Sequence, residues 1–353
     1  MKRKNNLFER IISFENILKA SKKARRGKRY KASTALFEYN LERNLLKIIE
    51  VLSNKTYVPG AYCDFHIYDP KKRIISAAPY FDRVIHHTLI NIIEPTIGKS
   101  FIYDTYACLK GRGTHKAVQR YKEFQKKNKY VLKCDVRKYF ENVDQEILLN
   151  KVQKKIKCKN TMWLVKQIID SRQSGRELTY FEGDDLFTPL YRKKGLPMGN
   201  LTSQFFANLY LNDFDHFIKE ELTARFYIRY CDDFVIFGNS KVWLNEIKCE
   251  IKKYLMTLRL RLHENKSRVF RTTDGVDFLG YRIYPDYVRV RKSIVKRYRR
   301  KLRDMTEEYK NGNIRIPEIN NSIQSWIGHV KHADSYQLRK EIFRNTVFTK
   351  TLN

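Results

Sequence analysis

Residues 225 to 237 read Arg-Phe-Tyr-Ile-Arg-Tyr-Cys-Asp-Asp-Phe-Val-Ile-Phe, so two adjacent carboxylates, Asp232 and Asp233, stand between two runs of aromatic and β-branched residues. Such runs favour strands, and the sequence predicts a tight β-hairpin with Cys231, Asp232 and Asp233 at its turn. Adjacent carboxylates at the tip of a buried hairpin repel each other unless a divalent cation lies between them. Asp is also common in turns because its side chain bonds backbone amides. A catalytic interpretation therefore needs a third carboxylate elsewhere.

Asp135 is the third carboxylate, because residues 129–136 predict a strand that ends beside it. A glycine-containing loop, Gly195 to Gly199, lies between this strand and the hairpin in the chain and precedes a predicted helix. Three carboxylates in this order can hold two divalent metals, one activating a primer 3′-hydroxyl and the other stabilising the leaving pyrophosphate. We assign Asp135 and Asp232 as bridging ligands and Asp233 as a supporting ligand. The expected cofactor is Mg²⁺, two ions per active site, with Mn²⁺ as an alternative.

The charge of the chain indicates a polyanionic partner. Its 353 residues include 71 Lys and Arg against 38 Asp and Glu, a formal net charge of +33. Nucleic acid held along its phosphates fits this excess best. An anionic membrane surface competes, but no apolar run could span a bilayer and no signal-peptide pattern opens the chain, so we expect no membrane partner. Six scattered cysteines lack zinc-ligand spacing and do not suggest a disulfide framework, which fits a reducing cytoplasm.

The remaining elements predict an α+β fold. Residues 1–55 favour helices around a basic cluster, Lys22 to Lys31, which is either a solvated face or a grip on backbone phosphates. Short strands are expected within 57–80, helices within 143–172 and 241–258, a loop-rich stretch from Gly175 to Gly195, a strand pair near 278–284, and basic helices from 293. Three helix ends are also predicted: a helix over 82–94 that stops before Pro95, one capped by Thr114, and one capped by Asn200 that runs to 222.

The chain resembles reverse transcriptases from about residue 60 to the C-terminal helices. Tyr230-Cys231-Asp232-Asp233 is similar to the family's Tyr-x-Asp-Asp motif, and Lys133-Cys134-Asp135 with Lys138-Tyr139-Phe140 is similar to its first catalytic motif. Among subfamilies it most resembles the reverse transcriptases of diversity-generating retroelements; antiphage-defence and group II intron-like bacterial enzymes share similar motifs. Four stretches carry this closer likeness: Tyr106-Ala107-Cys108 with Gly113-Thr114-His115, residues 195–204, Phe278-Leu279-Gly280-Tyr281-Arg282, and Ser325-Trp326-Ile327-Gly328-His329.

The resemblance implies roles around the incoming nucleotide. Phe140 falls where the family places the steric gate against a ribose 2′-hydroxyl, although it could be plain core. Either Arg73 or Lys72 would grip the triphosphate. The resemblance implies that Lys266 is a general acid that protonates pyrophosphate, and a surface lysine in a turn is the alternative.

The 195–204 stretch is expected to approach the new base pair. Met198, Gly199 and Gln204 are its predicted nucleotide-binding residues. Many reverse transcriptases carry Gln where Met198 stands, and Met lacks a strong donor, so we expect lower fidelity.

The resemblance also implies a right-hand polymerase fold with fingers, a palm whose antiparallel sheet carries the catalytic Asp residues, and a helical basic thumb. The expected divisions are an N-terminal basic helical extension (1–56), fingers and palm (57–290), and thumb (291–353). The predicted nucleic-acid-binding residues are Arg112, Lys292, Lys296, Arg297, Arg299 and Arg300. Phosphate contacts of this kind position a duplex without reading its sequence.

These features predict an RNA-directed DNA polymerase of the bacterial or phage-encoded cytoplasmic type. Its expected partners are template RNA, the RNA/DNA hybrid and dNTPs, with a bound non-coding RNA and an accessory protein or oligomer. The setting stays open between error-prone copying in a diversity-generating retroelement and antiphage defence on a structured non-coding RNA, with a group II intron maturase as a third option. A catalytically idle RNA-binding scaffold is the rival from another class.

Overall fold

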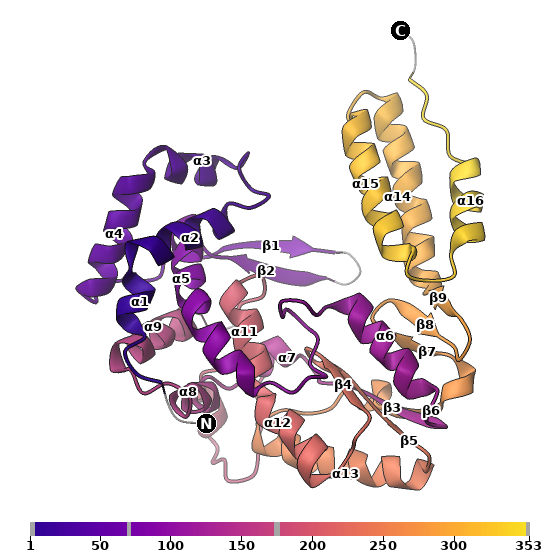
Figure 1. Cartoon of the computed structure of the whole chain (residues 1–353), viewed down its shortest axis with the longest axis horizontal. Coiled ribbons are helices and arrows are strands. Elements are labelled where there is room, and N and C mark those ends of the chain that lie inside the picture. The colour runs from indigo at the N-terminus through magenta and orange to yellow at the C-terminus, as the bar shows by residue number, and fades with distance from the viewer. Residues whose placement is uncertain (1–3, 69–71, 173–176, 351–353) are drawn as a thin grey trace. The chain divides into compact units, whose positions relative to one another are not determined.

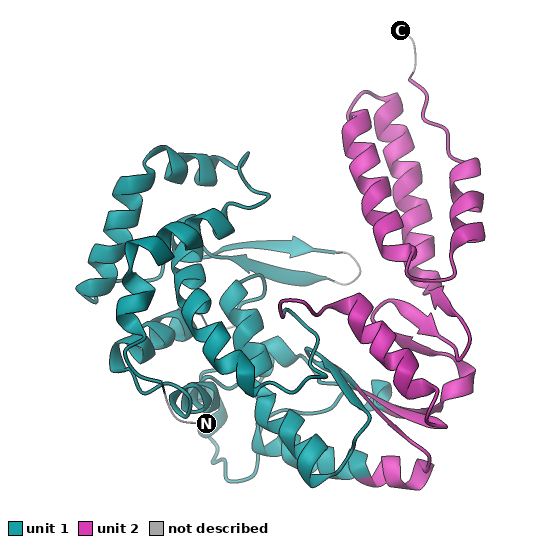
Figure 2. Ribbon diagram, viewed as in Figure 1, with its two compact units in different colours: residues 1–108, 134–234, 247–267 teal, residues 109–133, 235–246, 268–353 magenta. Residues whose placement is uncertain are grey.

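A computed structural model of the chain describes residues 4–68, 72–172 and 177–350 (Figure 1). The predicted loop start at Gly175 and the basic opening Met1-Lys2-Arg3 lie outside these residues. The chain forms two compact units that interleave in sequence (Figure 2). Unit 1 comprises residues 1–108, 134–234 and 247–267, and unit 2 comprises residues 109–133, 235–246 and 268–353. The expected divisions at 56 and 290 stay a prediction.

The N-terminal part of unit 1 is helical, as predicted. Its helices are α1 (Phe8–Ile12), α2 (Phe14–Ala24), α3 (Ala32–Tyr39) and α4 (Leu41–Ser53), followed by α5 (Tyr80–Ile97). The Ser13 hydroxyl caps α2 by accepting from the Asn16 amide at 3.4 Å. The Asn16 side chain in turn donates to the Thr88 carbonyl on α5 at 3.0 Å. These helices therefore pack as one body against α5.

The prediction that the helix before Pro95 would end there is wrong, because α5 continues to Ile97 with Pro95 inside it. Proline removes one backbone donor, but near a helix end that loss concerns a single bond. Ile90, Ile93 and Ile97 are buried on the same helix, and their burial offsets that loss. The Gly98 amide then closes the helix on the Glu94 carbonyl.

The expected short strands form an antiparallel pair, β1 (Cys63–Ile67) and β2 (Arg73–Ala77). Cys63 lies opposite Ala77, and Ile67 lies opposite Arg73. All of β1 is exposed. Arg73, the first residue of β2, therefore stands at the end of the exposed hairpin where β1 connects to β2.

The Asp-Asp hairpin belongs to a four-stranded sheet of order β4-β5-β3-β6. Its strands are β3 (Tyr130–Asp135), β4 (Tyr227–Tyr230), β5 (Asp233–Gly238) and β6 (Arg268–Arg271). β3 and β6 pair antiparallel, with Tyr130 opposite Arg271. Because Phe234 to Phe237 are all buried, both faces of β5 are covered. The predicted hairpin, the strand ending at Asp135 and the mixed helix–sheet class with antiparallel sheets are confirmed.

Unit 1 contains further helices after α5. They are α7 (Tyr139–Asn142), α8 (Gln145–Gln153), α9 (Lys159–Asp170), α10 (Thr188–Tyr191), α11 (Leu201–Tyr210), α12 (Asn212–His216) and the π-helical turn Phe217–Glu221. The predicted helix from 200 to 222 is broken at Leu211, where the backbone leaves the helical conformation, and α12 continues directly into the π-helical turn. Asn200 occupies the N-cap position, but its side chain donates to the Tyr62 hydroxyl instead of capping.

Unit 2 combines one helix, a small sheet and the C-terminal helices. Its elements are α6 (Thr114–Gln125), β7 (Val276–Phe278), β8 (Tyr281–Ile283), β9 (Val288–Val290), α14 (Lys292–Lys310), α15 (Ile316–Val330) and α16 (Tyr336–Arg344); α13 (Lys241–Thr257) runs from unit 2 into unit 1. The predicted Thr114 cap is wrong, because Gly113 is the N-cap and its φ of 122° suits glycine. In the C-terminal helices, Tyr298 stacks on Trp326 with ring centroids 4.0 Å apart.

The basic helix α14 carries an apolar stripe. Tyr298 and Leu302 are core residues there, and Ile294 and Val295 pack against them. Among the helices that the structure describes, none is both long and apolar enough to cross a membrane.

Candidate active site

A buried ion pair lies directly beneath the Asp-Asp turn. The Arg229 side chain, on β4, is fully buried and makes two bonds of 2.6 Å to the Asp215 carboxylate on α12. Tyr227 and Thr105 donate to the same carboxylate at 2.7 and 3.0 Å. The pair is therefore hydrogen-bonded on both partners, which a buried ion pair needs if it is not to destabilise the fold.

The same guanidinium holds the turn itself. Arg229 Nη1 donates to the Cys231 carbonyl and to the Asn208 side chain, both at 3.1 Å. Cys231 has a left-handed backbone, with φ of 60°, which costs energy for a residue other than glycine. A charge-assisted bond to its carbonyl stabilises that conformation. Two carboxylates, Asp232 and Asp233, consequently leave the turn in fixed directions.

The three predicted carboxylates influence one another. Burial, followed by repulsion from Asp233 and Asp135, raises the pKa of Asp232 to about 6, against the counteracting charge of Arg73. The Val136 amide donates to the Asp232 carbonyl at 3.3 Å, which joins the end of β3 to the turn. All-oxygen, negatively charged groups of this kind are the donors that Mg²⁺ and Mn²⁺ prefer, so the chemistry of the donor set fits a divalent cation.

Lys266 forms an ion pair with Asp135. Its ammonium group is hydrogen-bonded to Asp135 Oδ2. The short 3₁₀ turn Glu264–Lys266 carries it, and the His263 amide donates to the Asp135 carbonyl at 2.7 Å. Among the residues that the structure describes, no three His, Cys, Asp or Glu side chains converge into a finished metal-ligand group. Asp135 is paired with a cation of the protein instead.

The glycine loop packs against the β1–β2 hairpin. The Ser76 amide donates to the Met198 carbonyl at 2.9 Å. Gly199 has φ of 113°, and a Cβ there would lie 2.8 Å from the Ile75 methyl carbon Cγ2. Glycine is therefore required by both the backbone and the close approach. Met198 is half-buried, whereas Gln204 is exposed on α11.

The structure separates the two aromatic residues after Asp135. Tyr139 is core, and its hydroxyl donates to the Ala207 carbonyl at 2.6 Å. Phe140 is only half-buried, with its ring edge-on to Tyr139. Arg73 and Lys72 are both exposed; Arg73 acts electrostatically on Asp232, while Lys72 lies over the Tyr68 ring. These positions favour Arg73 over Lys72 as the residue nearer the carboxylates.

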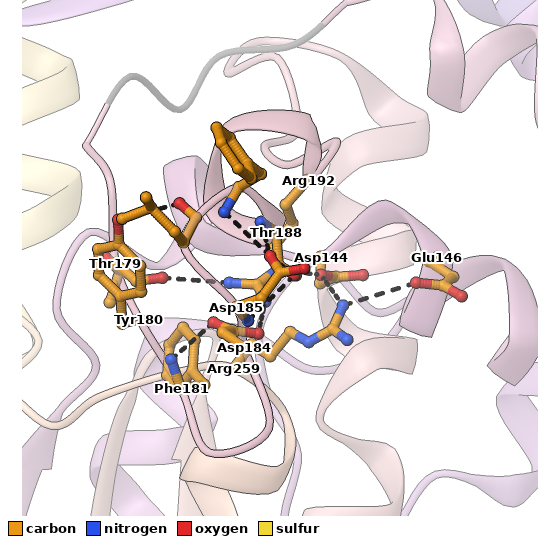
Figure 3. Close-up of polar contacts among 12 residues, drawn as sticks. Asp144, Glu146, Thr179, Tyr180, Phe181, Asp184, Asp185, Thr188, Arg192 and Arg259 are labelled. Atoms are coloured by element: carbon orange, nitrogen blue, oxygen red, sulfur yellow. Dashed lines mark hydrogen bonds and ion pairs between the residues drawn. The ribbon is translucent and has the colours of Figure 1, made fainter.

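A network of buried charges anchors the segment before the glycine loop (Figure 3). Asp144 caps α8 and accepts from Arg259 at 2.6 Å. The Arg192 side chain lies 3.6 Å from Asp144 and is hydrogen-bonded to Asp184. Alternating charges thus tie residues 179–192 to α8 and to the chain after α13, so the loop that follows has a fixed base.

The predicted nucleic-acid-binding residues lie in unit 2. Lys292, Lys296 and Arg299 line a groove of about 1080 Å³ between α14 and α16, where Arg299 is bonded to Glu341 at 2.6 Å. Arg297 and Arg300 are not among the residues that line this groove. The cations of α14 therefore do not form one uniform face. Arg112 precedes α6 in the turn between two glycines.

Three of the four stretches behind the subfamily likeness meet within unit 2. The Tyr281 hydroxyl lies 3.4 Å from His115 Nδ1 and donates to the His329 carbonyl at 2.8 Å. The His115 ring also stacks on His332, with centroids 3.5 Å apart. Each stretch was recognised separately in the sequence, but the sequence did not predict that they contact one another.

Sequence reasoning missed Arg229, Asp215 and Asn208 as residues that hold the hairpin. One signal was available: Arg229 is a cation inside an otherwise apolar predicted strand, two residues before the turn. Such a residue needs a buried anion or an exposed face. His86 on α5 is buried, and this burial lowers its pKa to about 3.

Comparison with known proteins identifies the class. Residues 68–283, more than half of the chain, match the family described as reverse transcriptase (RNA-dependent DNA polymerase). The chain belongs to this family.

Two curated relatives are bacterial. Protein YkfC of Escherichia coli is 23% identical over 261 residues, which cover 62% of this chain and 65% of YkfC. The group II intron-encoded protein LtrA of Lactococcus lactis is 22% identical over 320 residues, which cover 71% of this chain and 51% of LtrA. The chain thus spans about half to just under two thirds of these relatives.

Two solved structures of telomerase are also similar. Telomerase from Candida albicans with a telomeric RNA fragment gives a TM-score of 0.46 at 10% identity, over 84% of this chain and 57% of that one. Apo telomerase from Candida tropicalis gives 0.47 at 14% identity, over 69% and 59%.

The buried pair yields a first prediction. Arg229→Met or Asp215→Asn alone leaves an unpaired buried charge and should lower the free energy of unfolding by roughly 3–5 kcal/mol. The double variant removes both charges and should recover more than half of that loss. Urea denaturation of the four proteins measures the coupling. Additive losses would contradict the pair's role.

The raised pKa of Asp232 yields a second prediction. Its ionised form is disfavoured in the folded state, so this group costs stability above about pH 6 and costs nothing below its ordinary pKa of 3.8. Asp232→Asn should therefore stabilise the metal-free protein at neutral pH by roughly 1–3 kcal/mol, with the gain shrinking as the pH falls. Chemical denaturation at several pH values measures it. A variant less stable than wild type at neutral pH would refute this.

Gly199 yields a third prediction. Gly199→Ala should displace the loop from β2 and lower nucleotide incorporation roughly 10–100-fold, and it should lower the free energy of unfolding by roughly 1–2 kcal/mol because the φ of 113° is strained for alanine. The matched control is Gly98→Ala, where an added Cβ meets nothing within 4 Å and φ is −58°. Equal activity in both variants would show that the close approach is unimportant.

Proposed function

We propose that the chain is an RNA-directed DNA polymerase that makes cDNA from a bound template RNA. One observation carries the proposal: Asp232, at a hairpin turn fixed from below by Arg229, is electrostatically coupled to Asp135 at the end of the neighbouring strand. This coupling lies inside the region that matches the reverse transcriptase family. A turn former with no catalytic task has no need of coupled, partly buried carboxylates.

Asp135, Asp232 and Asp233 are the residues that would hold two divalent ions, Mg²⁺ or Mn²⁺. When bound, such ions supply charge stabilisation for in-line nucleotidyl transfer from a primer 3′-hydroxyl. Lys266 shields Asp135 when the carboxylate has no other cation beside it. An ammonium group at this position could donate a proton to pyrophosphate once Asp135 has another partner.

The substrate-binding roles follow from the placement of the loops. Arg73 stands at the end of the β1–β2 hairpin where the two strands connect, and its forked donors suit a triphosphate. Phe140 is the half-buried ring that would exclude a ribose 2′-hydroxyl. Met198, Gly199 and Gln204 would border the new base pair, and Met198 would lower fidelity because it offers no strong donor.

The nucleic acid would be held by the basic helices. In this proposal residues 57–290 are fingers and palm and 291–353 the thumb, and Arg112 and the α14 cations contact phosphates of the RNA/DNA hybrid. Lys292 and Lys296 are the exposed groove residues best suited to this. Arg299 would have to leave Glu341 or share its charge.

For the biological role, we propose error-prone copying in a diversity-generating retroelement. The four sequence stretches that resemble this subfamily and the presence of Met198 support it. The likeness to LtrA favours a group II intron-type role as the alternative, and antiphage defence on a structured RNA is a further one. Two bacterial relatives and the six unpaired cysteines fit a bacterial or phage-encoded protein of a reducing cytoplasm. An accessory protein or oligomer remains part of the proposal.

Primer extension on an RNA template tests this function. Wild type with Mg²⁺ and dNTPs should extend an annealed DNA primer, and Asp232→Asn should lower the rate at least about 10³-fold, because a charge-stabilising ligand is lost. The control is Glu246→Gln, an exposed carboxylate on α13. Extension by Asp232→Asn at the wild-type rate would overturn the proposal, and no extension by wild type would leave the RNA-binding scaffold in its place.

A further inference from the structure

The N-terminal helices carry a positive surface outside the matched family region. That region begins at residue 68, whereas α1 to α4 end at Ser53. Seven of the ten residues from Lys22 to Lys31 are Lys or Arg, and none is acidic. This turn joins α2 to α3.

The fold directs these cations outward. α2 buries Ile17, Ala20 and Ala24, so its last turn is fixed against the body of unit 1. At the corner, Glu38 accepts from Arg25 at 2.5 Å and from Ser21 at 2.9 Å. The turn is consequently held in place by side-chain hydrogen bonds.

Most of the charge at this corner is uncompensated. Burial and the nearby cations Arg83 and Lys31 lower the pKa of Lys28, and burial with Lys23 and Lys28 lowers the pKa of His87 to about 4. Across residues 4–68, 72–172 and 177–350, five cations of the turn have no carboxylate within ion-pair distance: Lys22, Arg26, Lys28, Arg29 and Lys31. An anion from outside the chain would relieve this repulsion.

Exposed aromatic rings accompany the cations. Tyr30 and Tyr39 are 83% and 87% exposed. α3 buries Thr34 and Phe37, so Leu36 and Tyr39, three residues apart, share its outward side. Cations for phosphates beside open rings for stacking are the combination that binds unpaired nucleotides.

We propose that the turn Lys22–Lys31 and the outward side of α3 form a second RNA-binding surface, which holds unpaired nucleotides of a structured RNA. Figure 1 shows α3 far from β4, so this surface is separate from the catalytic hairpin. The inference deepens the proposed function and rests on it, because a polymerase dedicated to one RNA needs a grip outside the copied nucleotides. A membrane surface is disfavoured, because the apolar side of α2 is buried against unit 1.

The test measures binding of a labelled uridine-rich single-stranded RNA by the full chain, with the polymerase site filled by an unlabelled RNA/DNA hybrid. The variant Arg26→Gln/Arg29→Gln/Lys31→Gln removes three exposed cations that have no carboxylate partner among the described residues. The control Lys154→Gln/Lys157→Gln/Lys159→Gln removes three exposed cations elsewhere in unit 1. The first should weaken binding at least about tenfold at ~0.1 M salt and reduce the salt slope by about two, while the control changes little.

The aromatic contribution is tested separately. Tyr30→Ala/Tyr39→Ala should weaken binding of the single strand several-fold but not that of a fully paired RNA duplex, and Tyr30→Phe/Tyr39→Phe should bind like wild type. Equal effects of the basic variant and its control would overturn the proposal. It would also be overturned if the basic variant lost only its binding to phosphatidylglycerol vesicles.

Primer extension on a saturating annealed hybrid separates the two proposals. The basic variant should extend at the wild-type rate, because its residues lie outside the catalytic machinery. If wild type does not extend, the polymerase function fails, while the RNA-binding comparison still decides on the surface.

Discussion

The Arg229–Asp215 ion pair is the constraint on which the candidate site depends. It joins β4, α12 and, through Asn208, α11, and the same guanidinium bonds the carbonyl of the strained residue Cys231. A buried ion pair contributes little net stability to a fold, because the cost of desolvating both charges cancels much of their attraction. What it supplies is direction: five donors in a rigid plane fix two helices and one turn at once. Rigid placement is what a carboxylate cluster needs if it is to bind a metal.

The site that rests on this pair carries its own electrostatic cost. Burial and like charges raise the pKa of Asp232, so the ionised form is disfavoured in the absence of a cation. Lys266 relieves part of that repulsion at Asp135. The repulsion between the carboxylates therefore favours binding of a cation. Sites that bind ligands commonly lower the stability of the fold in this way.

The sequence predicted much of this from two physical signals. Aromatic and β-branched runs predicted the hairpin and the strand of Asp135, and the excess of positive charge predicted a nucleic-acid partner. Where local rules failed, burial prevailed over them: α5 runs through Pro95 because its isoleucines are buried, and Asn200 bonds Tyr62 instead of capping. Arg229 was missed because a side chain's partner depends on which segments the fold brings together, and Asp215 lies 14 residues away on another element. The same limit hid the contact of His115, Tyr281 and His329.

The most direct measurement is Mn²⁺ binding, followed by electron paramagnetic resonance, in wild type and in the Arg229→Met/Asp215→Asn double variant. The double variant removes both buried charges and retains the three carboxylates, so a fall in affinity can come only through their placement. We predict at least about tenfold weaker binding in a folded double variant, because the Cys231 carbonyl loses its donor. Binding equal to wild type in a folded double variant would contradict the account, since the carboxylates would then be positioned without the pair.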